Sequence, residues 1–79
     1  MVPWSPRLWL ERIVGCPAEQ LRLVARSDVG DTSLVTYETP AGERITVLAV
    51  LEGGRWRVSA RHDGRWRRAD VLAGREVLW

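Results

Sequence analysis

Gly54-Arg55-Trp56-Arg57 recurs as Gly64-Arg65-Trp66-Arg67, and each copy begins at a glycine within a turn-forming stretch. Glycine supplies the positive φ that tight hairpin turns need. The repeat therefore predicts strands over residues 55–61 and 65–71. Because side chains alternate between the two sides of a strand, it also gathers arginine on one side. These strands decide the fold and the position of much of the positive charge.

Two further strands are expected before the repeat, over residues 33–39 and 44–52. Branched and aromatic apolar residues alternate there with polar ones, which is typical of half-buried strands. Pro40-Ala41-Gly42 suits a three-residue loop between them, and Gly53-Gly54 suits a two-residue turn into the third strand. The region 33–71 is therefore predicted to be an antiparallel meander.

The loop lengths also predict the register of this meander. The first loop places Tyr37 opposite Ile45, and the second places Leu51 opposite Trp56. A contiguous apolar face forms in that register, whereas a shift by one residue would scatter it over both sides of the sheet. Its expected members are Val35, Tyr37, Ile45, Val47, Ala49, Leu51, Trp56, Val58, Ala60 and Trp66.

The last turn decides the orientation of Trp66. We expect a three-residue loop at His62-Asp63-Gly64, which places Trp66 opposite Ala60 on the apolar face. A two-residue turn at Asp63-Gly64 would instead move Trp66 to the other face, beside Arg61. The orientation of Trp66 therefore separates two arrangements of the sheet.

A short helix is expected over residues 5–15, before the meander. Pro6 suits the first turn of a helix, and Gly15 can end it in the left-handed conformation. Trp9 and Ile13 lie one turn apart and form an apolar stripe. A helix this short is unstable alone, so we expect it to cover the apolar face of the sheet.

Residues 17–27 are compatible with a helix or with a strand. Leu21, Val24 and Ala25 fit helical spacing, whereas Leu21, Leu23 and Ala25 fit the alternation of a strand. The content of Ala, Glu, Gln, Leu and Arg favours the helix slightly. If the segment is a strand, the sheet could curve into a small barrel that resembles Sm-like or SH3-like domains.

We therefore predict a single α+β domain over residues 1–79. It has one or two N-terminal helices packed on a four- to five-stranded antiparallel meander. A short terminal segment over residues 75–79 follows, and we expect it to be ordered. Large apolar residues at a terminus usually pack back onto the domain, and this segment ends in Val77, Leu78 and Trp79.

The composition limits the classes of function. Cys16 and His62 are the sole residues of their kinds, so the chain can form neither an internal disulfide nor a tetrahedral metal site of its own. A domain of 79 residues has a small core, and oligomerisation is the stabilising device that remains. The net charge is only +2, although all twelve basic residues are arginines.

The sequence also bears on location. No apolar run is long enough to cross a membrane, so we expect no membrane partner. Pro3, Pro6, Arg7 and Glu11 interrupt the stretch where the apolar part of a secretion signal would lie. A reducing, cytoplasmic setting is therefore expected.

Catalysis has little support in the sequence. His62 lies in an expected turn, where an exposed histidine is ordinary. Cys16 has no second cysteine and no base beside it in the sequence, so we interpret it as a small apolar residue. The glycine pairs lead into strands, whereas a phosphate-binding loop leads into a helix. We therefore predict that the protein is not an enzyme and has no catalytic residues, cofactor or metal.

The second face of the predicted sheet carries the functional question. Arginine collects on it, and arginines opposed across neighbouring strands repel one another. Such an arrangement favours a partner with negative charge. The candidate residues for binding nucleic acid or another anion are Arg55, Arg57, Arg61, Arg65 and Arg67.

Apolar residues lie in the middle of the same face, at Leu34, Leu48 and Val50. An apolar patch with an arginine rim is typical of a protein interface. Trp4 and Trp79 are further candidates for contact with a protein. The leading prediction is a small non-enzymatic interaction or regulatory module that acts by protein–protein contact and self-associates. The alternative is a nucleic-acid-binding protein that uses the arginine-rich face.

Overall fold

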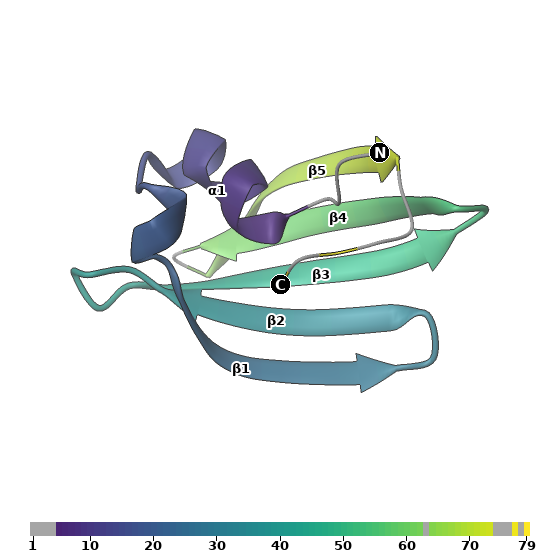
Figure 1. Ribbon diagram of the computed structural model, residues 1–79, viewed down its shortest axis with the longest axis horizontal. Helices are drawn as coiled ribbons and strands as arrows, with labels where there is room; N and C mark the ends of the chain where they lie inside the picture. Colours follow the sequence, from purple (N-terminus) through teal and green to yellow (C-terminus); the bar gives the residue numbers. More distant parts are fainter. Residues whose placement is uncertain (1–4, 63, 74–76, 78) are drawn as a thin grey trace.

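The computed structural model describes residues 5–62, 64–73, 77 and 79, with the backbone alone described over 67–73. One helix and a short 3-10 turn, η1, precede five antiparallel strands (Figure 1). The elements are α1 (Pro6–Val14), η1 (Ala18–Gln20), β1 (Arg22–Val29), β2 (Thr32–Glu38), β3 (Arg44–Glu52), β4 (Arg55–His62) and β5 (Arg65–Ala73).

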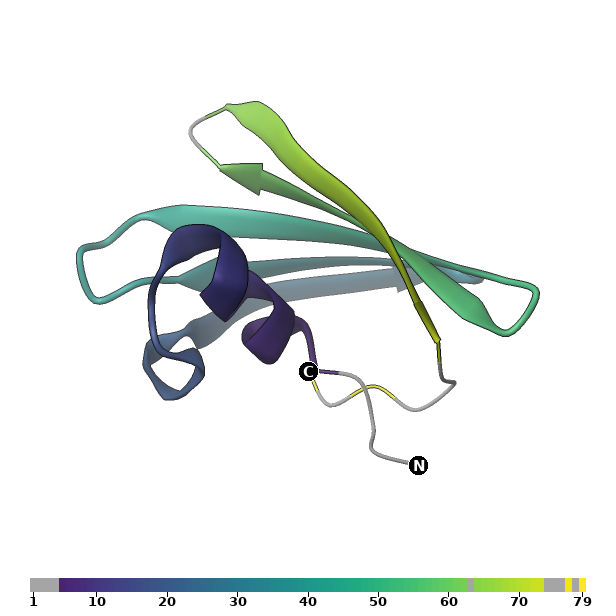
Figure 2. The ribbon, with the colours of Figure 1, turned by 90° about the horizontal axis from the view of Figure 1, so that it is seen from above.

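The strands lie side by side in chain order, and β1 and β5 form the two edges of the sheet. The predicted α+β class is therefore confirmed. The sheet is open, so the barrel alternative is wrong. Figure 2 shows that α1 lies against one face of this twisted sheet.

Helix α1 occupies the range expected for the first helix. Pro6 is its first residue, and Gly15 ends it with a φ of 72°, in the left-handed region that favours glycine. The Gly15 main-chain N–H donates to the Glu11 carbonyl oxygen at 3.1 Å. Trp9 and Leu10 are buried against the sheet, so the helix is held by tertiary packing.

The helix that we favoured within residues 17–27 is not formed. Only η1 is helical there, and β1 begins at Arg22 and pairs with β2. The ladder to β2 satisfies the backbone groups of the segment and outweighs its slight helical propensity. Every residue of β1 is exposed, whereas Leu21 just before it is buried. Strand β1 therefore extends the sheet beyond the core.

The first two hairpins have the predicted register. Tyr37 pairs with Ile45 across β2 and β3, and Leu51 pairs with Trp56 across β3 and β4. The two-residue turn between β3 and β4 has positive φ at both glycines, 58° and 77°, which is typical of a type I′ turn. Since these loops fix the register, the apolar face forms as expected from β2 to β4.

The predicted register of the last hairpin is wrong. His62 pairs with Arg65, so two residues separate the strands, and Trp66 pairs with Arg61. The shorter turn allows His62 to be the last residue of β4, where its side chain is 14% exposed. Its Nε2 atom lies within hydrogen-bond distance of the Glu43 carboxylate, at 2.5 Å. Trp66 is consequently 53% exposed, on the face opposite the core.

A register shift follows directly after Trp66. Ala60 pairs with Arg68, while Arg61 pairs with Trp66, so Arg67 is an extra residue in β5. Such a β-bulge changes the phase of a strand relative to its neighbour. The sequence repeat gives no sign of the bulge, because the two copies are the same at four positions yet only the second contains it.

The core lies between α1 and the face of β2–β4 that we call the covered face. Trp79 joins it from the terminal segment: its ring meets the Trp56 ring edge-to-face at 6.0 Å. The Tyr37 hydroxyl donates to the main-chain oxygen of Trp79 at 2.8 Å. The buried apolar members of the core are Trp9, Leu10, Leu21, Val35, Tyr37, Ile45, Val47, Ala49, Trp56, Val58 and Ala60.

Candidate functional site: the open face of the sheet

The other face of the sheet, which we call the open face, has no helix against it among the described residues (Figure 2). The registers place its residues in rows that cross the strands. The described side chains on it are Arg22, Ala25, Ser27, Val29, Thr32, Leu34, Thr36, Glu38, Arg44, Thr46, Leu48, Val50, Glu52, Arg55, Arg57, Ser59, Arg61 and Trp66. This face is therefore left uncovered by the described helix and by the core.

Four aliphatic residues on the open face form what we call the aliphatic strip: Val29, Leu34, Leu48 and Val50. Leu34 pairs directly with Leu48, and Val29 and Val50 both pair with Thr32 in the next row. Val29 is 75% exposed and Leu34 is 43% exposed. The strip runs over β1 to β3, where a fully solvated sheet would carry polar side chains.

One end of the strip is bordered by two arginines that share one carboxylate. Glu38 lies between two arginines, with carboxylate oxygens 2.8 Å from Arg22 and 3.5 Å from Arg44. In the row between this group and Leu34, the Thr36 and Thr46 hydroxyls hydrogen bond at 3.3 Å. This end of the open face is therefore polar but satisfies most of its own charges.

The β4 and β5 side of the open face carries a second group, the Arg–Trp ridge: Arg55, Arg57, Arg61 and Trp66. Arg57 pairs with Glu52 at 3.0 Å, and both side chains are more than half exposed. Arg55 and Arg61 form no ion pair with any other described residue. The ridge therefore has an excess of positive charge beside an exposed indole.

The predicted interface residues of the strip come together as expected, because Leu34, Leu48 and Val50 share the open face. Sequence reasoning did not place Arg22 or Val29 on this face, since segment 17–27 was left open between a helix and a strand, with a slight preference for the helix, and Val29 lies beyond it. The alternation of Leu21, Leu23 and Ala25 was a signal for a strand that brings Arg22 to the open face. A β-bulge between Leu23 and Ala25 then moves Ala25 and Val29 to the same face, and the alternation gives no sign of it. Strand β1 thus widens the candidate interface beyond the three residues predicted.

The predicted anion-binding residues are divided by the last hairpin. Arg55, Arg57 and Arg61 lie on the open face, whereas Arg65 pairs with His62 at the end of the covered face. The three-residue loop that we expected would have set Arg65 opposite Arg61, and this pairing is wrong, because Trp66 stands opposite Arg61 instead. The side chain of Arg67 lies outside the described residues, as does Trp4.

Trp79, the other predicted contact residue, packs onto the covered face of its own chain. The Arg26 guanidinium lies 4.7 Å from the centre of its ring, and the Arg7 guanidinium lies 5.6 Å from the centre of the Tyr37 ring. Burial raises the pKa of the Tyr37 hydroxyl, and the positive charge of Arg7 opposes this in part. These contacts give Trp79 a structural role beside any intermolecular one.

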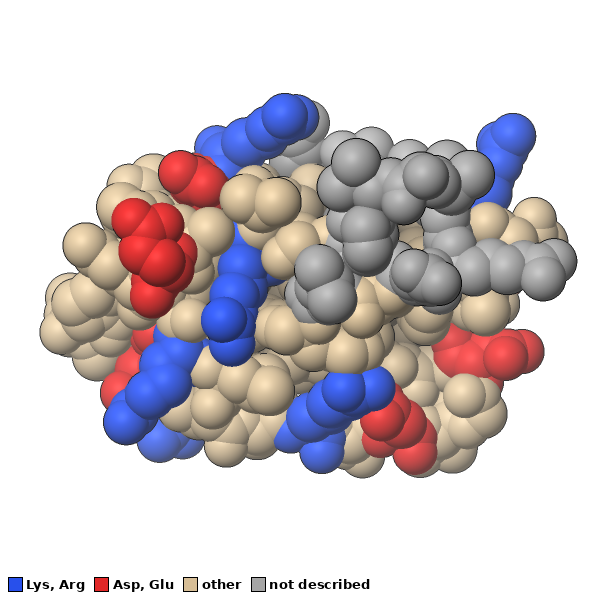
Figure 3. Space-filling view, viewed as in Figure 1, with Lys and Arg blue, Asp and Glu red and all other residues tan. Residues whose placement is uncertain are grey.

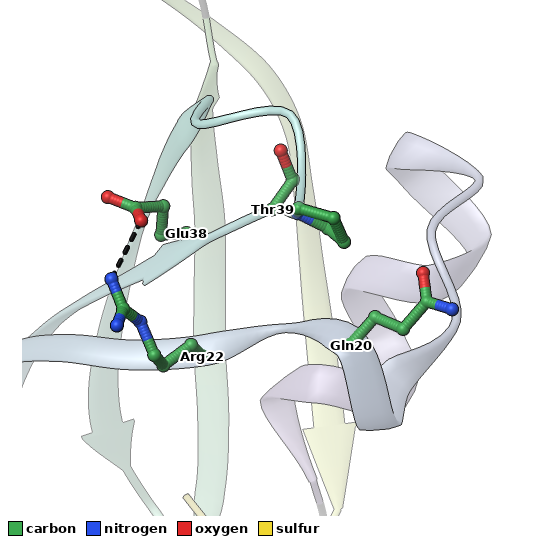
Figure 4. Close-up of a pocket in the computed structure, with 5 residues that line it drawn as sticks. Gln20, Arg22, Glu38 and Thr39 are labelled. Atoms are coloured by element: carbon green, nitrogen blue, oxygen red, sulfur yellow. Dashed lines mark hydrogen bonds and ion pairs between the residues drawn. The ribbon is translucent and has the colours of Figure 1, made fainter.

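The remaining chemistry-bearing groups are scattered. The Cys16 thiol is free and donates only to the Pro17 carbonyl oxygen at 3.7 Å. An open hollow of about 310 Å³ at the ends of β1 and β2 is lined by Gln20, Arg22, Glu38, Thr39 and Pro40. Figure 4 shows that the Arg22–Glu38 ion pair lies along its wall. None of these groups supplies a nucleophile beside a base.

The described part of the chain lacks two further features. No three His, Cys, Asp or Glu side chains lie together in a way that could hold a metal ion. No helix there is long and apolar enough to cross a bilayer.

Charge does not gather on the covered face. Figure 3, which views that face, shows arginine and acidic side chains interspersed over the described surface, with some of them side by side. Comparisons with protein-family models, with curated proteins and with solved structures gave no match to this chain. The open face is therefore the basis on which a function can be argued.

Proposed function

We propose that the protein is a non-enzymatic interaction module of the cytoplasm that acts by protein–protein contact and self-associates through its open face. The observation that carries this proposal is the aliphatic strip, which leaves Val29 and Leu34 exposed on a sheet that α1 covers only from the other side. A patch of this kind with a charged rim is how protein interfaces are commonly built. The free thiol of Cys16 fits a reducing compartment.

A second copy of the chain is the partner that fits the size of the molecule. The two longer extents of the domain are 36 and 25 Å, so one face is comparable to the ~800 Å² that each partner buries in a standard interface. A domain this small also gains stability from association. In a two-fold dimer, Glu38 and Glu52 at the ends of one strip can meet arginines of the other copy.

Sedimentation equilibrium from about 1 µM to about 1 mM tests the proposal. We expect a reversible dimer whose dissociation constant rises at least about tenfold in the Leu34→Glu variant, because a two-fold interface would bury two unpaired carboxylates. Leu8→Glu is the matched control, since Leu8 is 57% exposed but lies on α1, away from the open face. It should leave the association unchanged.

Two results would contradict the proposal. One is a monomer over the whole concentration range. The other is equal loss of association in the Leu34→Glu and Leu8→Glu variants, which would place the contact elsewhere or make it non-specific. Both positions are exposed, so at a concentration low enough for the protein to be monomeric each variant should unfold at nearly the same temperature as the unsubstituted protein.

A further inference from the structure

The Arg–Trp ridge is distinct from the aliphatic strip in position and in chemistry. Its three arginines lie on one side of β4, with Ser59 between Arg57 and Arg61, and the span from Arg55 to Arg61 covers about 20 Å of extended strand. Trp66 stands at the Arg61 end of this span, on the neighbouring strand. The ridge is therefore a linear row of cations that ends in an aromatic surface.

We propose that the Arg–Trp ridge binds single-stranded nucleic acid, with the guanidinium groups on phosphates along the strand and the Trp66 indole stacked on an unpaired base. Proteins that bind single strands combine a positively charged track with aromatic side chains, because every base has a face that can stack. This inference does not rest on the proposed self-association, since it uses different residues on different strands.

The arginines of the ridge are available to a phosphate. Arg55 and Arg61 have no acidic partner among the described residues, and all three ridge arginines are exposed. Both side chains of the Arg57–Glu52 ion pair are exposed to solvent, and exposed ion pairs contribute little to stability. A phosphate can therefore take the place of Glu52 at Arg57, and guanidinium binds phosphate through two parallel hydrogen bonds.

Trp66 is available to a base. It is 53% exposed and makes no ring contact with another described residue, whereas Trp9 and Trp56 are buried in the core. About half of the indole is open to solvent on the sheet, and Arg61 opposite it can add a cation to the same stack. An unpaired base offers a free face to this surface, but a base inside a duplex does not.

Anisotropy of a labelled single-stranded RNA of about twelve nucleotides, at about 50 mM and about 200 mM salt, tests the inference. Three phosphate contacts predict a slope of about −2 for the logarithm of the binding constant against the logarithm of the salt concentration. Arg61→Ala should make that slope less steep by about 0.7. Arg12→Ala is the matched control, because Arg12 is exposed on α1 and outside the open face.

Trp66 is tested by two variants that separate stacking from folding. Trp66→Ala should weaken binding at least about fivefold, and Trp66→Phe should restore most of it, because a phenyl ring can still stack. The Leu34→Glu variant of the strip should bind the RNA within about threefold of the unsubstituted protein, so that loss of self-association and loss of RNA binding are measured apart.

Each of four results would overturn the inference. The first is a slope near zero, and the second is equal weakening by Arg12→Ala and Arg61→Ala. The third is unchanged binding in Trp66→Ala. The fourth is equal binding of a duplex, or of a polyglutamate peptide of matched charge. This result would mean that the ridge binds any polyanion and that base stacking does not contribute.

Discussion

The two faces of this sheet are made from the same strands, but one face is buried and the other is exposed to solvent. On the covered face, residues from three strands are fully buried under α1 and Trp79. On the open face, the alternate residues of those strands expose an aliphatic strip and a row of arginines. Because side chains alternate along a strand, the residues that form the core lie on one side of the sheet and the candidate binding residues lie on the other.

The largest expected difference between the faces is in the cost of removing an aliphatic side chain. Ile45→Ala on the covered face should lower the free energy of unfolding by about 2–5 kcal/mol, because it leaves a cavity in a fully buried site. Leu34→Ala on the open face should cost less than about 1 kcal/mol. Urea unfolding of both variants at a concentration where the protein is monomeric measures the contrast, and similar losses would mean that Leu34 is buried within the monomer.

A smaller difference is expected for hydroxyl groups. Tyr37→Phe removes the hydrogen bond to the Trp79 main-chain oxygen and should cost about 0.5–1.5 kcal/mol. Thr46→Val removes the hydroxyl that meets Thr36 on the open face, where water can replace it, and should be nearly neutral. Thermal unfolding compares the stabilities of the two variants. A greater loss of stability in Thr46→Val than in Tyr37→Phe would mean that the Thr46 hydroxyl is buried and the Tyr37 hydroxyl is not.

The covered face should also show itself in alkaline titration. Tyr37 is the one tyrosine of the chain, so the absorbance of tyrosinate reports it alone. Burial raises its pKa above the ordinary value near 10, so the folded state binds the proton more tightly than the unfolded state. The resulting stability is complete below the unfolded pKa and is lost as the pH rises through the folded one. A Tyr37 pKa at the ordinary value would mean that its hydroxyl is exposed to solvent.

The smallest effect is expected at the β1 edge, where the covered face meets solvent. Hydrogen bonds from Ser33 and then from Arg26 lower the pKa of the Asp28 carboxyl. A lowered folded pKa gives stability that is present above the unfolded pKa and is lost as the pH falls through the folded value. In Ser33→Ala, NMR titration should show the pKa of Asp28 moving up towards its ordinary value. An unchanged pKa of Asp28 would mean that Ser33 does not hydrogen bond to it.

The sequence was sufficient for the parts of the fold that tight turns control. Gly53-Gly54 fixes the hairpin of β3 and β4, and Pro40-Ala41-Gly42 fixes the one before it, so the apolar face and the strip residue Leu48 could both be predicted. The class of the fold followed from the same patterns, since a meander with one short helix needs the helix as its cover.

Two features were left open between alternatives, because contacts distant in sequence decide each of them. Strand β1 forms through its ladder to β2, against a local preference for helix, and it brings Val29 to the open face. The last hairpin adopts the shorter turn together with a bulge, which places His62 against Glu43 and turns Trp66 outward. The candidate ridge therefore became visible only with the register of β5.

Hydroxyl-radical footprinting at low and high protein concentration tests most directly that the open face is the contact surface. In dilute solution Val29, Leu34 and Trp66 should be labelled, while Trp9 stays protected within the core. At high concentration labelling of Val29 and Leu34 should fall, and labelling of Leu8 on α1 should not change. A fall at Leu8 instead, or strong protection of Leu34 in dilute solution, would contradict the account.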